Sequence, residues 1–112
     1  MKNKEEFKIR QMLLKMEISA NALAHHYIIE AIKILRKQRI HTNTATLYKM
    51  IEKRLHAKSA TAVERAIRYS IQSSWIKNSI LTKVYSKKPV TSAFLYDLVF
   101  NFDIFLKAAE EN

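Results

Sequence analysis

Apolar residues recur every three or four positions along most of the chain, a spacing that predicts a succession of α-helices. The first two helices are expected at residues 5–17 and 22–37. The polar stretch Thr42-Asn43-Thr44 then offers capping side chains before a shorter helix that runs to about His56. Because the sequence has no glycine and one proline, chain reversals are few. The pattern predicts an all-α fold, a compact bundle of five to six helices in a single domain covering residues 1–112.

Residues 59–76 separate into two faces when they are placed about 100° apart on a helix. One face gathers apolar or small residues such as Val63, Ile67 and Ile71. The opposite face carries Thr61, Arg65, Arg68 and Gln72, with Glu64 on its flank. Guanidinium, amide and carboxylate groups are the ones that meet base edges in the major groove of DNA. With the short helix before it, the segment of about residues 46–76 therefore has the form of a helix-turn-helix whose second helix reads DNA.

Other interpretations of this segment remain open. Thr61 and Glu64 fit the T-x-x-E capping box, in which the carboxylate reaches back to a backbone N–H. A polar stripe with two arginines is also common on a solvated helix face. Since the turn has no glycine, a residue within 56–58 is expected in the left-handed conformation, at a cost of about 1 kcal/mol.

The C-terminal part of the chain predicts helices of another kind. Residues 80–85 are short and apolar, and one or two helical turns are favoured over a small strand. Thr91 and Ser92 then cap a final helix, over about residues 92–109, that is apolar almost all round. A small domain buries only part of such a helix, so we expect a homodimer, or else that the first two helices cover the surplus. The expected dimer interface residues are Leu98, Phe102, Phe105 and Leu106.

The charge of the chain favours a negatively charged partner. The formal net charge is +10 at pH 7, and residues 33–88 carry 14 Lys or Arg side chains against two glutamates. The basic field is therefore centred on the predicted helix-turn-helix, and double-stranded DNA is preferred over an anionic membrane. Residues expected on the DNA backbone are Lys53, Arg54, Lys58, Ser59, Thr61, Lys87 and Lys88. For the last two lysines, which precede Pro89, an ordinary solvated turn is an equally good interpretation.

Several classes of protein are disfavoured by what the sequence lacks. Without cysteine and glycine there are no disulfides, cysteine–zinc sites, P-loops or dinucleotide-binding motifs. The histidines, at positions 25, 26, 41 and 56, do not have the spacing of a metal site. No apolar run is long enough for a membrane span, and we expect no signal peptide because the N-terminal residues K-N-K-E-E-F lack its apolar core. We expect a cytoplasmic, nucleoid-associated protein that is not an enzyme and needs no cofactor.

Residues 47–75 resemble the DNA-binding effector domain of the sporulation response regulator of endospore-forming bacteria. Residues 63–68, V-E-R-A-I-R, match a motif of that family in full, and Ile71 and Trp75 fall in register. A weaker similarity extends over about residues 18–100. The resemblance implies a bundle of about six helices in which the V-E-R-A-I-R segment lies in the major groove of a short DNA box.

The resemblance also implies roles for individual residues. Arg65 would bind O6 and N7 of a guanine, Glu64 would accept from a cytosine amino group, and Arg68 would bind a neighbouring base or a phosphate. Gln72 would make a further contact. The family alignment makes Ser59 the N-cap, which would free Glu64 from a capping box.

The chain departs from the family pattern in ways that bear on function. Ala62 stands where the family usually has a basic residue, and the family's flanking glycines are absent. The 112 residues leave no room for the family's receiver domain, so we expect regulation by abundance or by a partner. Two functions follow: a sequence-specific transcriptional regulator, or a receiver-less interaction protein that modulates a full-length regulator through mixed dimers or competition for sites.

Overall fold

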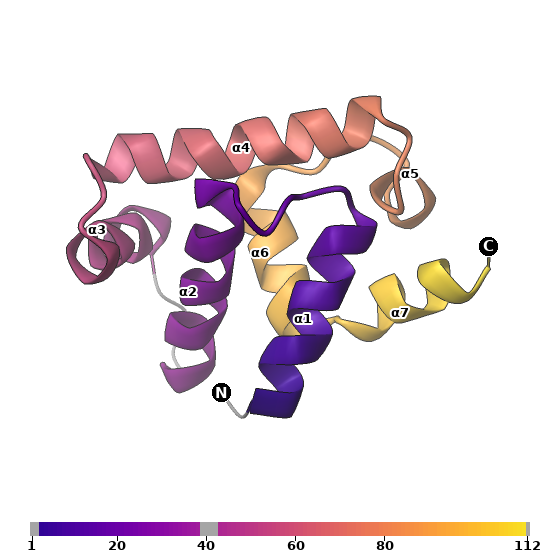
Figure 1. The fold of residues 1–112 in the computed structure, drawn as a ribbon, viewed down its shortest axis with the longest axis horizontal. Helices are drawn as coiled ribbons and strands as arrows, with labels where there is room; N and C mark the ends of the chain where they lie inside the picture. The colour runs from indigo at the N-terminus through magenta and orange to yellow at the C-terminus, as the bar shows by residue number, and fades with distance from the viewer. Residues whose placement is uncertain (1–2, 39–42, 112) are drawn as a thin grey trace.

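The computed structural model describes residues 3–38 and 43–111, and seven α-helices lie within them (Figure 1). In chain order they are α1 (Asn3–Lys15), α2 (Leu23–Lys37), α3 (Thr44–Leu55), α4 (Ala60–Ile76), α5 (Leu81–Val84), α6 (Thr91–Phe100) and α7 (Asp103–Glu110). The described residues contain no β-strand, so the prediction of an all-α fold is confirmed. Positions 41 and 42, which the sequence analysis considered as a possible ligand and a cap, lie outside the described residues.

The helix α2 is the centre of the bundle. It contacts α1, α3, α4 and α6, and its buried side chains include Ile28, Ile32 and Ile34. In Figure 1, α4 lies across one end of α2 and α6, while α1 runs beside α2. Because the body of the protein covers only one side of α4, the other side faces outward.

The polar ends of α1 and α2 are held together by ion pairs. Glu5 pairs with Arg36, and Glu6 lies 3.2 Å from the Lys33 ammonium and 3.1 Å from the Arg10 guanidinium. The hydrogen bond from Arg10, and then that from Lys33, lower the pKa of the Glu6 carboxyl. The acidic first turn of α1 therefore offsets part of the basic last turn of α2, away from α4.

Three residues other than glycine adopt the left-handed conformation. They are Glu17, His56 and Asn78, with φ values of 62°, 53° and 56°. Each follows the end of a helix, where the chain must reverse sharply and glycine is the usual residue. The prediction of a left-handed residue within 56–58 is confirmed at His56.

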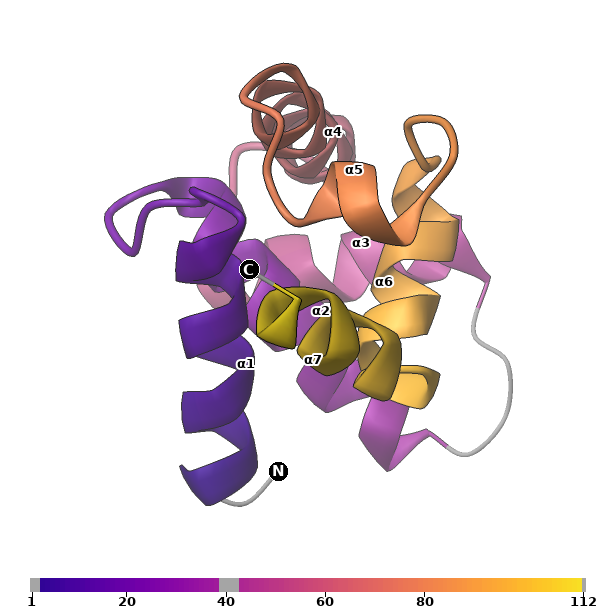
Figure 2. The same cartoon turned by 90° about the vertical axis from the view of Figure 1, so that its right-hand side faces the viewer.

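The C-terminal region differs from the single long helix that was expected. The helix is interrupted at Asn101. The side chain of this residue donates a 2.9 Å hydrogen bond to Asp97, and its backbone leaves the helical region. After this break α7 turns away from α6 and contacts α1 and α5 (Figure 2). Phe105 thereby enters the core, with its ring centroid 6.2 Å from that of Phe94. The prediction of one helix over residues 92–109 is therefore wrong, since the break divides its apolar surface between two directions.

The break also corrects part of the expected dimer interface. Leu98 and Phe105 are both fully buried inside the single chain, with 0% exposure, so neither is available to a partner. Phe102 is half-buried against the core, and Leu106 is exposed. The packing of α7 onto α1 and α5 therefore buries part of the apolar surface that suggested a partner, and the rest stays exposed on α6 and α7.

Candidate nucleic-acid interface

The turn between α3 and α4 is built from backbone and side-chain caps. The left-handed His56 lets the N–H groups of His56 and Ala57 bond to the carbonyl of Glu52, which closes the end of α3. Ser59 then begins α4, and its Oγ accepts a 2.9 Å hydrogen bond from the N–H of Ala62. Residues 56–59 thus set α4 at a fixed angle to α3.

Ser59, and not Thr61, is the N-cap of α4. The interpretation of Thr61 and Glu64 as a capping box is therefore wrong, because Thr61 is the second residue of the helix and not its N-cap. The Glu64 side chain is left available for other partners.

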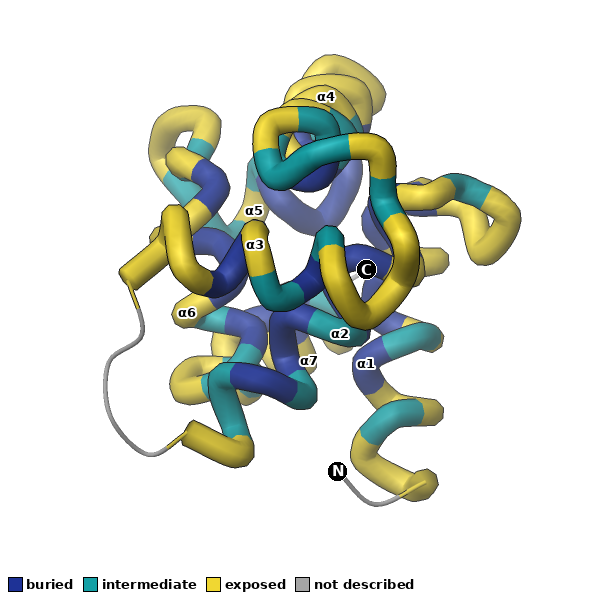
Figure 3. Tube along the Cα trace, turned by 90° about the vertical axis from the view of Figure 1, so that its left-hand side faces the viewer, coloured by how far each residue is buried: buried dark blue, intermediate teal, exposed yellow. Residues whose placement is uncertain are grey.

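The two faces of α4 are separated as the sequence predicted. Val63, Ile67 and Ile71 are at most 1% exposed and pack against the body. On the outer face, Thr61, Arg65, Arg68 and Gln72 are all exposed. Figure 3 shows this division along the helix, with its outer side exposed and the side toward α2 buried. Four side chains able to bond DNA therefore project together from one rigid element.

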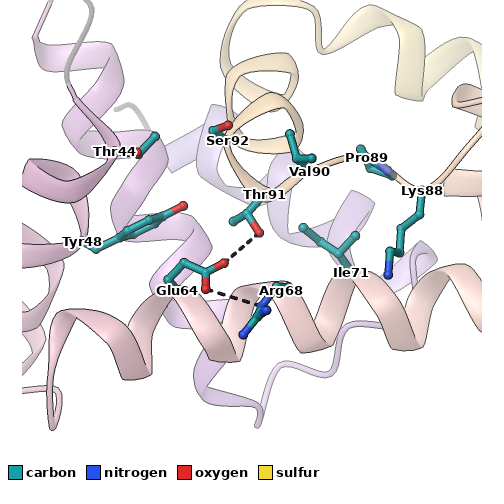
Figure 4. Close-up of a pocket in the computed structure, with 10 residues that line it drawn as sticks. All are labelled: Thr44, Tyr48, Glu64, Arg68, Ile71, Lys88, Pro89, Val90, Thr91 and Ser92. Atoms are coloured by element: carbon teal, nitrogen blue, oxygen red, sulfur yellow. Dashed lines mark hydrogen bonds and ion pairs between the residues drawn. The ribbon is translucent and has the colours of Figure 1, made fainter.

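Glu64 does not project freely with them. Its Oε2 accepts a 3.2 Å hydrogen bond from the Thr91 hydroxyl at the start of α6, and its Oε1 lies 3.4 Å from Nε of Arg68 (Figure 4). Tyr48 of α3 lines the same groove, which has a volume of about 390 Å³ between α4 and α6. Burial raises the pKa of Tyr48 to about 12, with a smaller contribution from the negative charge of Glu64.

The contact between Thr91 and Glu64 was not predicted. The sequence predicts Thr91 as a cap for the last helix, but the N-cap of α6 is Val90 and Thr91 lies inside the helix. The two residues are 27 positions apart, and only the packing of α6 against α4 brings them together. A sequence pattern of helical spacing carries no signal for such a contact.

Arg68 has contacts on two sides. Besides its ion pair with Glu64, its guanidinium carbon lies 5.5 Å from the ring centroid of the neighbouring Tyr69. The Arg68 side chain is nevertheless 53% exposed, so the guanidinium remains accessible from outside. Arg65, one turn earlier, is exposed on the same face.

The candidate phosphate-binding residues lie around this face in two groups. Lys53, Arg54 and Lys58 are exposed on α3 and the turn, beside the start of α4. Arg54 Nη1 also lies 3.9 Å from Glu30 of α2, which offsets part of its charge. On the other side, Lys87 and Lys88 are exposed in the loop before α6, and Lys88 lines the groove that contains Arg68. The helix α4 is therefore flanked by basic side chains on both sides.

Exposed apolar side chains form a second feature, on α6 and α7. The rings of Tyr96 and Phe100 lie 4.5 Å apart between centroids, and both side chains are exposed. Ile104 and Leu106 on α7 are exposed as well, at 36% and 42%. Of these four, only Leu106 is among the interface residues that the sequence predicted, because that prediction assumed one unbroken helix.

Within 3–38 and 43–111, no three candidate ligand side chains gather in a way that would hold a metal ion. Among the helices of the same part of the chain, none has the length and apolar character to cross a membrane.

A comparison with protein families gives one match that covers most of the chain. The family described as "Sporulation initiation factor Spo0A C terminal" matches residues 9–97, from within α1 to within α6. No curated protein and no solved structure matches the chain. The matched region contains the whole of α3, the turn and α4.

Proposed function

The chain belongs to the family of sporulation initiation factor C-terminal domains, which are DNA-binding effector domains, and on this premise we propose that it binds short specific DNA boxes as a transcriptional regulator. The observation that carries the proposal is the outer face of α4. There Arg65, Arg68 and Gln72 are exposed together on a helix whose other face is fixed in the core. Rigid presentation of several base-reading side chains is what the major groove requires.

Within this proposal, Arg65 is the main reader of bases. Its guanidinium is exposed in the first half of α4, and a bidentate contact of Arg with O6 and N7 of guanine is the commonest specific contact in the major groove. Gln72, two turns later on the same face, has an amide suited to adenine. Glu64 has two partners within the protein, Thr91 and Arg68.

The basic side chains on either side of α4 would hold the DNA backbone. Lys53 and Arg54 lie in the last turn of α3, and Lys58 lies in the turn that leads to Ser59 and Thr61 at the start of α4. Lys87 and Lys88 lie on the opposite side, in the loop before α6. Phosphate contacts position a protein on DNA without reading the DNA sequence. These groups would therefore supply affinity and salt dependence.

We also propose that the chain acts on DNA as a homodimer. The apolar side chains exposed on α6 and α7, Tyr96, Phe100, Ile104 and Leu106, support this, with Phe102 half-buried beside them. A second copy bound to an adjacent site would bury this surface and double the DNA contact.

The same exposed surface favours a second candidate function. A full-length regulator of the family would offer its own effector domain, and the chain would then form mixed dimers or compete for DNA sites. A pull-down of a full-length regulator that is lost when Phe100 and Ile104 are made polar would support this function. If the chain regulates promoters in cells that lack any full-length regulator, this function is excluded.

A selection of bound sequences from random duplexes tests the proposal. At a fixed salt concentration of about 0.15 M, we expect enrichment of a short motif that contains at least one guanine essential for binding. If the bound pool remains as random as the input while the chain still binds duplex DNA, the binding is nonspecific and the proposal of box recognition fails.

A further inference from the structure

The Glu64 carboxylate connects the outer face of α4 to a different helix. One oxygen accepts from the Thr91 hydroxyl at 3.2 Å, and the other lies 3.4 Å from Nε of Arg68. Figure 4 shows this chain of contacts, in which Glu64 is joined to Thr91 by one dashed line and to Arg68 by another. An arginine on the exposed face is therefore linked through one carboxylate to the start of α6.

Thr91, at one end of this chain of contacts, is held rigidly. Thr91 is 7% exposed and is followed in α6 by Phe94 and Leu95, which are 0% and 1% exposed. The helix α6 contacts both α2 and α4. Since the backbone of Thr91 is fixed by this packing, its hydroxyl is a fixed donor that holds Glu64 in one orientation. Tyr48, 8% exposed, closes the groove on the α3 side.

The Arg68 end is exposed but oriented. Its Nε contacts Glu64, and its guanidinium carbon lies over the ring of Tyr69, 5.5 Å from the centroid. A guanidinium has five N–H donors, so a contact at Nε leaves further donors for a base or a phosphate. A long side chain that is oriented before binding loses less conformational entropy when it meets its target.

We propose that Thr91 is a positioning residue for DNA reading, which acts through Glu64 to orient the guanidinium of Arg68 before DNA binds. This inference rests on the proposed function and deepens it. It gives Glu64 a role different from the one that the family resemblance implies. Its carboxylate orients Arg68, and base discrimination at Arg68 depends on a hydroxyl of α6 that need not touch the DNA.

A double-mutant cycle tests the DNA part of this inference. The ratio of dissociation constants for a scrambled and a selected duplex is measured for Thr91→Val and Thr91→Ser, each in the wild-type and in the Arg68→Ala background. We expect Thr91→Val to reduce the ratio by about two- to tenfold, the range of one hydrogen bond. Thr91→Ser keeps the hydroxyl and should keep the ratio. In the Arg68→Ala background, Thr91→Val should change nothing further.

A measurement on the free protein tests the orientation itself. Nitrogen-15 relaxation of the Arg68 Nε–H group reports how far this side chain moves on the picosecond to nanosecond timescale. We expect its order parameter to fall in Thr91→Val and to stay at the wild-type value in Thr91→Ser. A role of Thr91 in the stability of α6 alone would not change this order parameter in the folded protein.

Two results would overturn the inference. One is an unchanged Arg68 order parameter in Thr91→Val. The other is a loss of discrimination from Thr91→Val that is as large in Arg68→Ala as in the wild type, since Thr91 would then act without Arg68. Failure of the proposed function gives a different result: the wild type itself would not discriminate between the two duplexes, while the relaxation measurement would still decide whether Thr91 orients Arg68.

Discussion

The hydroxyl of Tyr85 donates a 2.7 Å hydrogen bond to the carboxylate of Asp97, which joins the end of α5 to the middle of α6. Asp97 also accepts from Asn101, the residue at which the helix breaks. The Tyr85 ring lies 6.2 Å from that of Phe105 between centroids. Burial, and then the hydrogen bond to Asp97, raise the pKa of the Tyr85 phenol. Tyr85 thus links the end of α5 to both α6 and α7.

Tyr85→Phe removes this hydrogen bond and leaves the ring in place. Hydrogen bonds to charged acceptors contribute about 1.5–3 kcal/mol, and Asp97 keeps Asn101 as a partner, so we expect a loss of about 1–2 kcal/mol in the free energy of unfolding. Urea denaturation measures it. Tyr69→Phe, at an exposed tyrosine, is the matched control and should unfold like the wild type. Equal stability of the two variants would contradict the role given to Tyr85.

His56→Gly should stabilise the protein. His56 is exposed and has φ 53°, a conformation that costs residues with a Cβ about 1 kcal/mol. We expect the free energy of unfolding to rise by about that amount, with no change in the ratio of affinities for selected and scrambled DNA. His56→Ala keeps the Cβ and should give no such gain. A glycine variant no more stable than the alanine variant would show that the turn carries no strain.

The sequence predicted those structural features that depend only on residues close together in the chain. The two faces of α4 follow from the spacing of Val63, Ile67 and Ile71, and the left-handed residue at His56 follows from a tight turn without glycine. The positions of these side chains relative to one helix axis are fixed once the helix forms. For this reason the exposure of Arg65 and Arg68 was predictable from the sequence.

Contacts between distant segments were not predictable in the same way. The break at Asn101 depends on a side-chain hydrogen bond to Asp97 and on the space that α1 and α5 offer to Phe105. An apolar sequence without glycine or proline gives no sign of it. The hydrogen bond from Thr91 to Glu64 likewise depends on how α6 packs against α4. A complete amphipathic analysis of either helix would still have missed both features.

His25 makes stability depend on pH. It is 1% exposed, its Nδ1 lies 3.3 Å from the carbonyl of Ile18, and desolvation is the main cause that lowers its pKa, with smaller effects of the nearby Arg10 and His26 charges. In the unfolded chain the pKa returns to about 6.5. The unfolded state therefore binds more protons below that pH, so stability is complete above about pH 6.5 and is lost as the pH falls through the native pKa.

Urea denaturation at about pH 7.5 and about pH 5.5 measures this effect, above the range in which carboxyl groups titrate. We expect the wild type to be less stable at the lower pH. His25→Phe should be less stable at the higher pH, because it loses the bond to Ile18, but should show a smaller change with pH. His26→Gln, at the exposed neighbour, should keep most of the wild-type pH dependence, because the charge of His26 is the smallest of the causes that lower the pKa of His25. A wild-type slope in His25→Phe would contradict the assignment.

Charged substitutions on α6 and α7 test the proposed dimer surface. Phe100→Glu combined with Ile104→Glu places two carboxylates on the exposed apolar side chains of α6 and α7, which opposes burial of that surface. We expect the wild type to sediment as a dimer at micromolar concentration and the double variant as a monomer with unchanged helix content. Ile76→Glu, at an apolar residue 72% exposed on α4, is the control and should remain dimeric. A wild type that is monomeric both free and on DNA would contradict the proposed homodimer.

The outer face of α4 is proposed to read bases, and the most direct test compares Arg65→Ala with Lys88→Ala on selected and scrambled duplexes over a range of salt concentrations. Arg65→Ala is predicted to weaken binding to the selected duplex by about 1–3 kcal/mol and to leave binding to the scrambled duplex nearly unchanged. Lys88→Ala is predicted to weaken both about equally and to lower the salt slope by about 1. Equal losses on both duplexes for Arg65→Ala would contradict the account, because Arg65 would then contact only the DNA backbone.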